Sequence, residues 1–412
     1  MEDHLKSQIK YALKYIPVNL AKAPFTKRSS PETRRIRESN GGKMMHGLCH
    51  ASHVEDDKIL TDIGVTWVRD GGVLPFDEDG TLREEYLRDK ARAIQQKAAG
   101  IKRMWITPNP GWFLRIGIDP RTPEGLERVA EIARFLAEDL QGVADAFQIG
   151  NEMSIPRFAG GLTLQECCTF AGTIAKAMAP VKKEILVGFN LIGPQVDQVV
   201  LMRPYMEYID YVGFDIYIGS FFKYVPYLAM HGLCAKFLWT FTKKPIILCE
   251  FGYLSAGQPK TEEEKTALLN SYGIKDENDL RENPDTFLQN LSAKTGNHVG
   301  ENYVNRCASH GKGDYLLSMD FINHIYCQLG KGVQIKHCPH TGEGQAEFYR
   351  RLLPRLEKLP YLVGAFIYNY HDYGECCICG QSECPMETKW GICEQDNTPK
   401  PAYYAIGEIW NP

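Results

Sequence analysis

Short apolar runs alternate with longer amphipathic segments from residue 43 to the end of the chain. Eight runs rich in β-branched and aromatic residues cover 44–49, 66–69, 102–106, 146–150, 185–189, 211–216, 245–249 and 364–370. Between them, residues 82–99, 123–140, 163–178 and 345–353 carry apolar side chains at helical spacing, the last segment being stopped or kinked by Pro354. Strands that alternate with helices predict a parallel sheet with crossover helices.

Eight strands favour a closed (β/α)8 TIM barrel over an open sheet. An open doubly wound sheet usually has a glycine-rich phosphate-binding turn after its first strand. Here Gly41 and Gly42 precede the first run, and no G-x-G-x-x-G pattern follows a run. The length of 412 residues suits one barrel with additions. We therefore expect a barrel domain over residues 43–412.

Two segments fall outside the regular alternation. Residues 1–42 form an N-terminal extension, which starts with a helical stretch at 5–15 and ends in a basic stretch at 22–37 that we interpret as solvated. Residues 254–344 form an insertion between the seventh and eighth strands, far longer than an ordinary connection. A loop of this size at the catalytic face shapes a pocket or a subunit contact. The sequence therefore leaves open whether the protein forms a homo-oligomer.

Composition and charge narrow the class of protein. A net charge of −4 gives no broad basic surface for nucleic acid. No long apolar run could span a membrane, and no apolar signal stretch follows the first residues. The odd count of 13 cysteines does not suit a framework of paired disulfides. These features predict a cytoplasmic protein that binds neither nucleic acid nor membranes.

Two glutamates stand where a TIM barrel places its active site. Glu152 follows Ala-Phe-Gln-Ile-Gly-Asn directly after the fourth strand, and Glu250 follows Pro-Ile-Ile-Leu-Cys directly after the seventh. The carboxyl ends of barrel strands carry the catalytic residues. Glycoside hydrolysis uses two carboxyl groups, one to protonate the leaving oxygen and one to attack or to activate water. Both glutamates are therefore candidate catalytic residues.

The surroundings of these glutamates resemble those of the clan A glycoside hydrolases. That clan places its acid/base after an asparagine on strand four, as in Asn151-Glu152, and its nucleophile on strand seven, as in Glu-Phe-Gly at Glu250. Arg69 at the end of strand two and Tyr217 in Gly-Phe-Asp-Ile-Tyr resemble the residues that hold the clan's nucleophile. The resemblance covers about residues 43–253 and 346–408.

The resemblance implies a retaining β-glycosidase that acts on small glycosides or oligosaccharides and needs no cofactor for catalysis. Glu250 would form a covalent glycosyl-enzyme and Glu152 would serve as the acid/base, with the carboxyl groups about 5–5.5 Å apart. Asn151 would bind the sugar 2-hydroxyl. Transglycosylation or phosphorolysis at the same site, and a non-catalytic carbohydrate-binding barrel, remain alternatives.

One position departs from the clan pattern. The clan places a tryptophan at the end of strand eight as a floor for the sugar ring, whereas this chain has Ile-Tyr-Asn-Tyr-His-Asp at 367–372. We assign the stacking role to Tyr370, with Trp390 as the alternative, because either ring can cover a sugar face. His50, at the end of the first strand, is a candidate contact for a sugar hydroxyl.

A cluster of cysteines follows the eighth strand, and we call residues 376–393 the cysteine loop. Four of its five thiolates could hold a structural zinc ion, although the second half lacks the C-x-x-C of a zinc ribbon. The alternative is a loop of reduced, buried thiols, and Cys338 or His340 could replace a ligand. The proposed ligands are Cys376, Cys379, Cys384 and Cys393.

Overall fold

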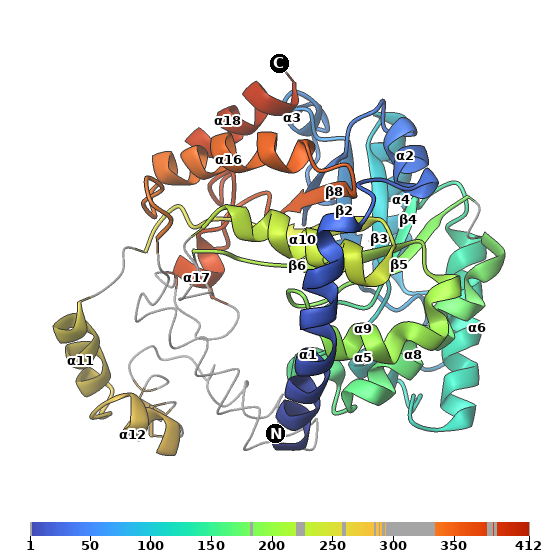
Figure 1. The fold of residues 1–412 in the computed structure, drawn as a ribbon, viewed down its shortest axis with the longest axis horizontal. Helices are drawn as coiled ribbons and strands as arrows, with labels where there is room; N and C mark the ends of the chain where they lie inside the picture. Colours follow the sequence, from blue (N-terminus) through green and yellow to red (C-terminus); the bar gives the residue numbers. More distant parts are fainter. Residues whose placement is uncertain are drawn as a thin grey trace.

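A computed structural model of the protein describes residues 2–181, 184–219, 227–257, 261–283, 286–287, 289–290, 293, 334–376, 382 and 385–411. Eight parallel strands close into a barrel in sequential order (Figure 1). The prediction of a (β/α)8 TIM barrel is therefore confirmed. The strands are β1 Met45–Cys49, β2 Trp67–Gly71, β3 Lys102–Ile106, β4 Ala146–Ile149, β5 Leu186–Phe189, β6 Tyr211–Asp215, β7 Ile246–Phe251 and β8 Leu362–Ile367.

Helices lie outside the barrel, and several begin at side-chain caps that satisfy free backbone N–H groups. Thr163 and Glu166 form a capping box at α8, and Thr122 caps α6. The helices up to β6 are α1 Glu2–Lys22, η1 Ala23–Phe25, α2 Pro31–Glu38, α3 Lys58–Thr61, α4 Glu84–Ala98, α5 Pro110–Arg115, α6 Pro123–Asp139, α7 Pro156–Ala159, α8 Leu164–Ala177, η2 Ala179–Val181, α9 Val196–Met202 and η3 Arg203–Tyr208. Those after β6 are α10 Ala229–Thr242, α11 Glu262–Ser271, α12 Glu277–Glu282, α16 Gly342–Glu357, α17 Pro385–Thr388 and α18 Pro401–Trp410.

Helix α16 is longer than the predicted segment at 345–353. It begins earlier because the Thr341 hydroxyl accepts a hydrogen bond from the Gly344 amide. It also continues past Pro354 to Glu357. Pro354 has no N–H to donate to the carbonyl of residue 350, so the helix lacks one backbone hydrogen bond there. Helix α16 packs beside α18 on the outside of the barrel (Figure 1).

The barrel interior is a separate apolar cluster from the layer between strands and helices. Alternate residues point inward in β1, β6 and β7, as a period of two requires, and Ile36 of α2 joins this cluster. The interior residues are Met45, Cys49, Trp67, Met104, Ala146, Tyr211, Ile247, Cys249, Val363 and Phe366. Glycine is required at position 213, because a Cβ atom there would lie 2.4 Å from Cys249 Sγ.

The N-terminal extension packs against the barrel instead of being wholly solvated. Helix α1 lies along α9 and α10, and Asn19 Nδ2 donates to the Phe237 carbonyl at 3.0 Å (Figure 1). Arg37, in the basic stretch, donates to the carbonyls of Leu359 and Leu362 at 3.1 and 2.9 Å. The prediction of a solvated stretch is therefore wrong at Arg37, which binds the turn before β8.

The segment between β7 and β8 contains helices α11 and α12 in its described part (Figure 1). Most of the remainder of the predicted insertion, residues 294–333, lies outside the described residues. Among the helices that the structure describes, none combines the length and the apolar character that a membrane crossing requires.

Candidate active site

A β-bulge in β7 turns Glu250 into the mouth of the barrel. Leu248 pairs with Phe214 and Glu250 pairs with Asp215, so Cys249 has no partner on β6. Cys249 points into the barrel, and strict alternation would turn the next side chain outward. The extra residue re-aims Glu250 instead. Glu250 lies within β7, and its predicted place just past the strand is corrected.

Arg69 and Tyr217 bind the two oxygens of the Glu250 carboxylate. Arg69 Nη1 donates to Oε1 at 2.7 Å, and the Tyr217 hydroxyl donates to Oε2 at 2.5 Å. Glu250 is 7% exposed and Arg69 is fully buried, so solvent screens this ion pair little. Burial and the charge of Glu250 raise the pKa of Tyr217 well above its usual value, which keeps the phenol protonated as a donor.

The backbone after β4 is held in an unusual conformation that presents Glu152. Glu152 has φ +46°, a left-handed value that few non-glycine residues adopt, and it follows Gly150 at φ +60°. Asn109 Oδ1 accepts from the Asn151 amide at 2.7 Å, and Asn190 Oδ1 accepts from the Glu152 amide at 3.0 Å. These two asparagines, at the ends of β3 and β5, fix the direction of the Glu152 side chain.

Asn151 lies at the centre of a buried polar network. Its Oδ1 accepts from Arg69 Nη2 at 2.6 Å, from Gln148 Nε2 at 3.2 Å and from Asn190 Nδ2 at 2.9 Å. Arg69 Nε also donates to Gln148 Oε1 at 2.7 Å. Because three donors fix the amide oxygen, the NH₂ group of Asn151 is oriented away from them and can serve a ligand.

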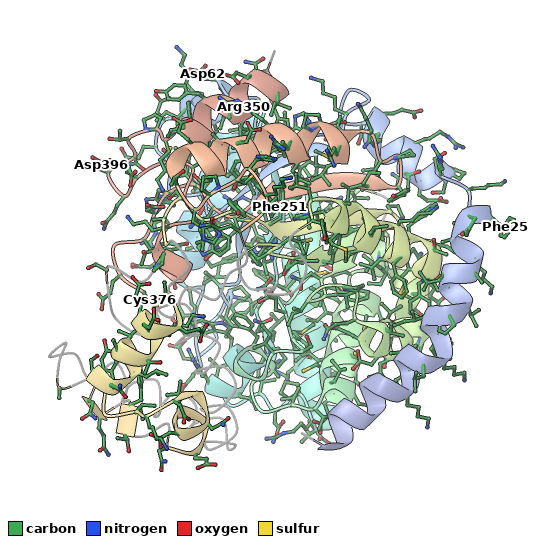
Figure 2. The ribbon with its side chains drawn as sticks, turned by 60° about the vertical axis from the view of Figure 1, so that its left-hand side comes forward. Phe25, Asp62, Phe251, Arg350, Cys376 and Asp396 are labelled. Carbon is green, nitrogen blue, oxygen red and sulfur yellow. The ribbon has the colours of Figure 1, made fainter. Side chains whose placement is uncertain are left out.

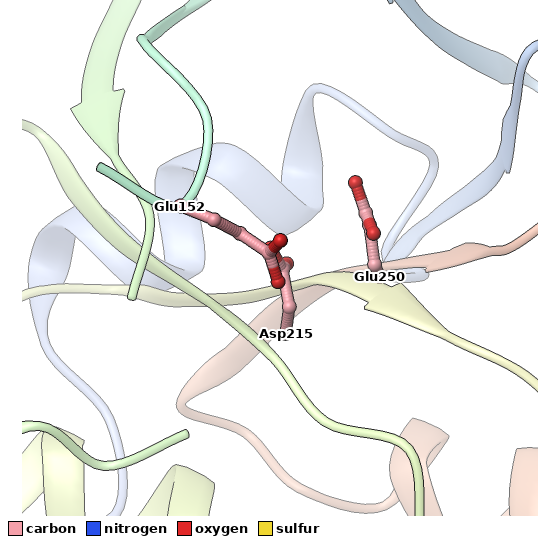
Figure 3. Close-up of side chains that lie close together, drawn as sticks. All are labelled: Glu152, Asp215 and Glu250. Carbon is pink, nitrogen blue, oxygen red and sulfur yellow. The ribbon is translucent and has the colours of Figure 1, made fainter. Parts of the chain in front are cut away.

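Three carboxyl groups meet in the barrel mouth, those of Glu152, Asp215 and Glu250 (Figure 3). One oxygen of each lies within 4.8 Å of the others. Asp215 was not predicted as a site residue. Carboxylate oxygens at this spacing could hold a divalent cation, but Arg69 already supplies a positive charge at 2.7 Å from Glu250. The arrangement suits two carboxyl groups acting on one bound molecule.

The aromatic residue beside this group is Tyr368 and not Tyr370. Strand β8 ends at Ile367, so Tyr368 is the first residue past it, and its ring lies edge-on to Tyr217 at 5.9 Å. The assignment of the stacking position to Tyr370 is corrected, because that ring is 1% exposed and packs edge-on to His53 at 5.8 Å. Trp390 is 2% exposed, and its ring centroid lies 4.8 Å from that of Tyr217. It therefore packs against Tyr217 and holds that ring in place.

His50 lies at the rim of the same mouth. Its backbone has φ +53°, and its ring is edge-on to Tyr368 at 5.4 Å. Nδ1 lies 3.6 Å from an oxygen of Asp70, which follows Arg69 on β2. Burial disfavours the charged imidazole, but the hydrogen bond and negative charge of Asp70 outweigh it and raise the pKa of His50. His50 is thus a partly exposed donor near the carboxyl groups.

The cysteine loop is described only in part. Cys376, labelled in Figure 2, and Cys393 are buried, whereas Cys379 and Cys384 lie outside the described residues. Burial raises the pKa of Cys393 to about 12. Both ring nitrogens of His340 lie within 3.1 Å of backbone carbonyl oxygens, those of Gly257 and Gly219. His340 is therefore engaged and is not available as a metal ligand.

Comparison of the whole fold with solved structures finds glycosidases. The Eisenbergiella tayi glycoside hydrolase family 2 β-galacturonidase, solved with galacturonate, matches with a TM-score of 0.51 and 12% identity over 90% of this chain and 51% of that one. The Bacteroides uniformis β-glucuronidase matches with a TM-score of 0.52 and 13% identity over 89% and 35%. The Faecalibacterium prausnitzii β-glucuronidase gives 0.50 and 14% over 90% and 49%.

The likeness is one of structure. The sequence matches no protein-family model and none of the curated proteins. The chain spans about half or less of the length of the solved proteins named above. Identities of 12–14% establish a shared fold and no more. At the level of the fold, the resemblance to clan A is confirmed: this chain is a TIM barrel similar to those of family 2 glycoside hydrolases.

Proposed function

We propose that the protein is a retaining β-glycosidase in which Glu250 is the nucleophile and Glu152 is the acid/base. The observation that carries the proposal is the separation of the two carboxyl groups, whose nearest oxygens lie within 4.8 Å. Retaining enzymes hold their carboxyl groups about 5–5.5 Å apart, whereas inverting enzymes need about 6.5–9.5 Å to admit a water molecule. The oxygen–oxygen distance is compatible with the retaining separation, and Glu250, held by Arg69 and Tyr217, is placed for direct attack.

The two glutamates differ in a way that suits two roles. Glu250 accepts from Arg69 and Tyr217, so its carboxylate is oriented to attack the anomeric carbon. Glu152 is the more exposed of the two and projects from the loop after β4. In the first step its proton passes to the glycosidic oxygen as the bond to the leaving group breaks and the ester to Glu250 forms.

The second step reverses the proton transfer. Glu152, now a carboxylate, takes a proton from water, and the water oxygen attacks the anomeric carbon and releases Glu250. Asn151 would hold the sugar 2-hydroxyl through its NH₂ group, since its carbonyl oxygen is already bound. Tyr368 and His50 would contact the sugar from the β8 and β1 side of the mouth.

The experiment that tests this proposal is a panel of 4-nitrophenyl glycosides. It should contain β-glucoside, β-galactoside, β-mannoside, β-glucuronide and β-galacturonide, with the matching α-glycosides as controls. The last two β-glycosides represent the sugars in the names of the similar structures. We expect turnover of at least one β-glycoside and of no α-glycoside. Binding without turnover of any member would favour the non-catalytic barrel.

The same panel separates hydrolysis from the other reactions of this site. A transglycosidase gives more nitrophenol than free sugar when a second sugar is added as an acceptor. A phosphorylase gives turnover that depends on added phosphate. For hydrolysis we expect equal amounts of nitrophenol and free sugar and no dependence on phosphate.

We also propose that the cysteine loop binds one structural zinc ion. Clustered thiols in a reducing compartment are usually coordinated by a metal ion, and four protein ligands leave no open position for a substrate.

Metal analysis of protein purified without chelators should find about one zinc per chain. Cys376→Ser should lower both the zinc content and the melting temperature. Cys234→Ser, at a buried free cysteine of α10, is the matched control. A zinc content near zero, with all 13 thiols titratable after unfolding, would refute the proposal.

A further inference from the structure

Asp215 is a third carboxyl group in the barrel mouth that the two catalytic roles leave unexplained. Tyr211 of β6 points into the barrel, so alternation also turns Gly213 and Asp215 inward. Asp215 is 1% exposed, and one of its oxygens lies within 4.8 Å of oxygens of both Glu152 and Glu250. Figure 3 shows its carboxyl group next to that of Glu152.

The two oxygens of Asp215 have different surroundings. Oδ2 accepts from Asn190 Nδ2 at 2.5 Å. Oδ1 is fully buried, and within the described part of the chain it has no hydrogen-bond partner. If Asp215 were ionised, its buried and unpaired oxygen would cost free energy, because a buried charge needs several donors to replace water. A proton on Oδ1 removes that cost and makes this oxygen a donor.

Four other titratable groups surround Asp215, and all four are neutral. Burial raises the pKa of the Cys49 and Cys249 thiols, which point into the barrel below it. Burial likewise raises the pKa of the Tyr211 and Tyr217 phenols on β6 and in the loop after it. None of these four groups carries a charge near neutral pH. The protonation state of Asp215 therefore depends on the neighbouring acids and on Arg69.

The described charged groups that face Asp215 are one cation, Arg69, and two acids, Glu152 and Glu250. Arg69 is bound to Glu250 at 2.7 Å, and its charge, like the hydrogen bond from Asn190, lowers the pKa of Asp215. Burial and the two glutamates outweigh both effects. Burial raises the pKa of Asp215 well above its usual value, and the negative charges of Glu250 and Glu152 raise it further. When neighbouring carboxyl groups lie in different environments, their pKa values move apart, and each group can then take a different role.

We propose that Asp215 is held as a neutral carboxylic acid whose Oδ1 hydroxyl donates a hydrogen bond to Glu152. Both Glu250 oxygens already accept a hydrogen bond, and Glu152 is the more exposed glutamate, so it can approach Asp215. The inference rests on the proposed function. When Glu152 gives its proton to the leaving oxygen, Asp215 keeps its own proton and stabilises the new carboxylate. Asp215 is thus a positioning residue that acts through Glu152.

The first test measures protonation and needs no substrate. An infrared difference spectrum between the protein and Asp215→Asn at pH 7 should contain the carbonyl band of one buried carboxylic acid. Asparagine has the same shape and is neutral, so the fold should be preserved. Absence of that band would show that Asp215 is ionised and would overturn the proposal, whether or not any glycoside is cleaved.

The second test compares substrates and depends on activity. Asp215→Asn should retain kcat/KM within about tenfold, because the amide NH₂ can replace the hydroxyl as donor. Asp215→Ala should lose about 10²-fold with poor leaving groups and much less with a dinitrophenyl glycoside, which leaves without a proton. Asp197→Asn, at a buried aspartate of α9, should keep the leaving-group dependence of the unchanged protein.

Different outcomes of the two tests would overturn the proposal. An equal loss on both substrates in Asp215→Ala would indicate a purely structural role and would overturn the proposal. An Asn variant as damaged as the Ala variant would mean that an ionised carboxylate is required, which also overturns it. If the unchanged protein cleaves no glycoside, the proposed function fails, and the infrared band alone then decides the state of Asp215.

Discussion

Replacing Glu250 by glutamine should lower kcat at least about 10⁴-fold on every β-glycoside that the protein cleaves. An amide cannot attack the anomeric carbon to form the ester. Glutamine keeps the shape of the side chain, and its carbonyl can still accept from Arg69, so the loss should be chemical. Initial rates with the best nitrophenyl glycoside measure it, and calorimetry checks that the melting temperature is retained.

The matched control for this variant is Glu347→Gln. Glu347 lies on α16, where its side chain is 35% exposed and pairs with Arg351, outside the barrel mouth. Its rate should equal that of the unchanged protein. A Glu250→Gln protein that folds normally and keeps more than about a tenth of the activity would rule out Glu250 as nucleophile.

The second large effect is expected for Glu152→Ala. Loss of the proton donor should slow glycosides with poor leaving groups by about 10²–10⁴-fold, while dinitrophenyl glycosides still form the glycosyl-enzyme. The intermediate should then accumulate, because no base activates water. Added azide needs no base, so it should restore turnover and give a β-glycosyl azide, which NMR of the product identifies.

Azide also distinguishes the two glutamates from each other. In Glu250→Ala it would take the place of the nucleophile, and it would give the product of inverted configuration. A retained azide from Glu250→Ala together with an inverted azide from Glu152→Ala would mean that the two roles are exchanged. Glu250→Ala is therefore the direct control for the rescue of Glu152→Ala.

The barrel could be predicted because apolar residues recur with a period of two along its strands. Inward residues such as Met45 and Ile247 alternate with outward residues such as Leu48 and Leu248, and this pattern identifies strands before any pairing is known. The end of the eighth strand was predicted too late, because tyrosines at 368 and 370 continue the alternation. The pairing of β8 with β1 and β7 ends at Ile367, which the pattern does not reveal.

Part of the site follows from the same alternation. Gln148, Asn190 and Asp215 fall at inward positions near strand ends, so a period of two extended past the apolar residues would have indicated all three. The bulge at Cys249 could not be predicted, because it depends on how β6 and β7 pair. The left-handed backbone of Glu152 is likewise set by hydrogen bonds that the amides of Asn151 and Glu152 donate to Asn109 and Asn190, which are distant in sequence.

The central claim is a covalent bond between Glu250 and the sugar. A 2-deoxy-2-fluoro glycoside with a dinitrophenolate leaving group slows both steps but lets the first finish, so the intermediate accumulates. Mass spectrometry should show one fluoroglycosyl group per chain, located in the peptide that contains Glu250. A label on Glu152 or Asp215, or a protein that turns over glycosides with inversion and takes up no label, would contradict the account.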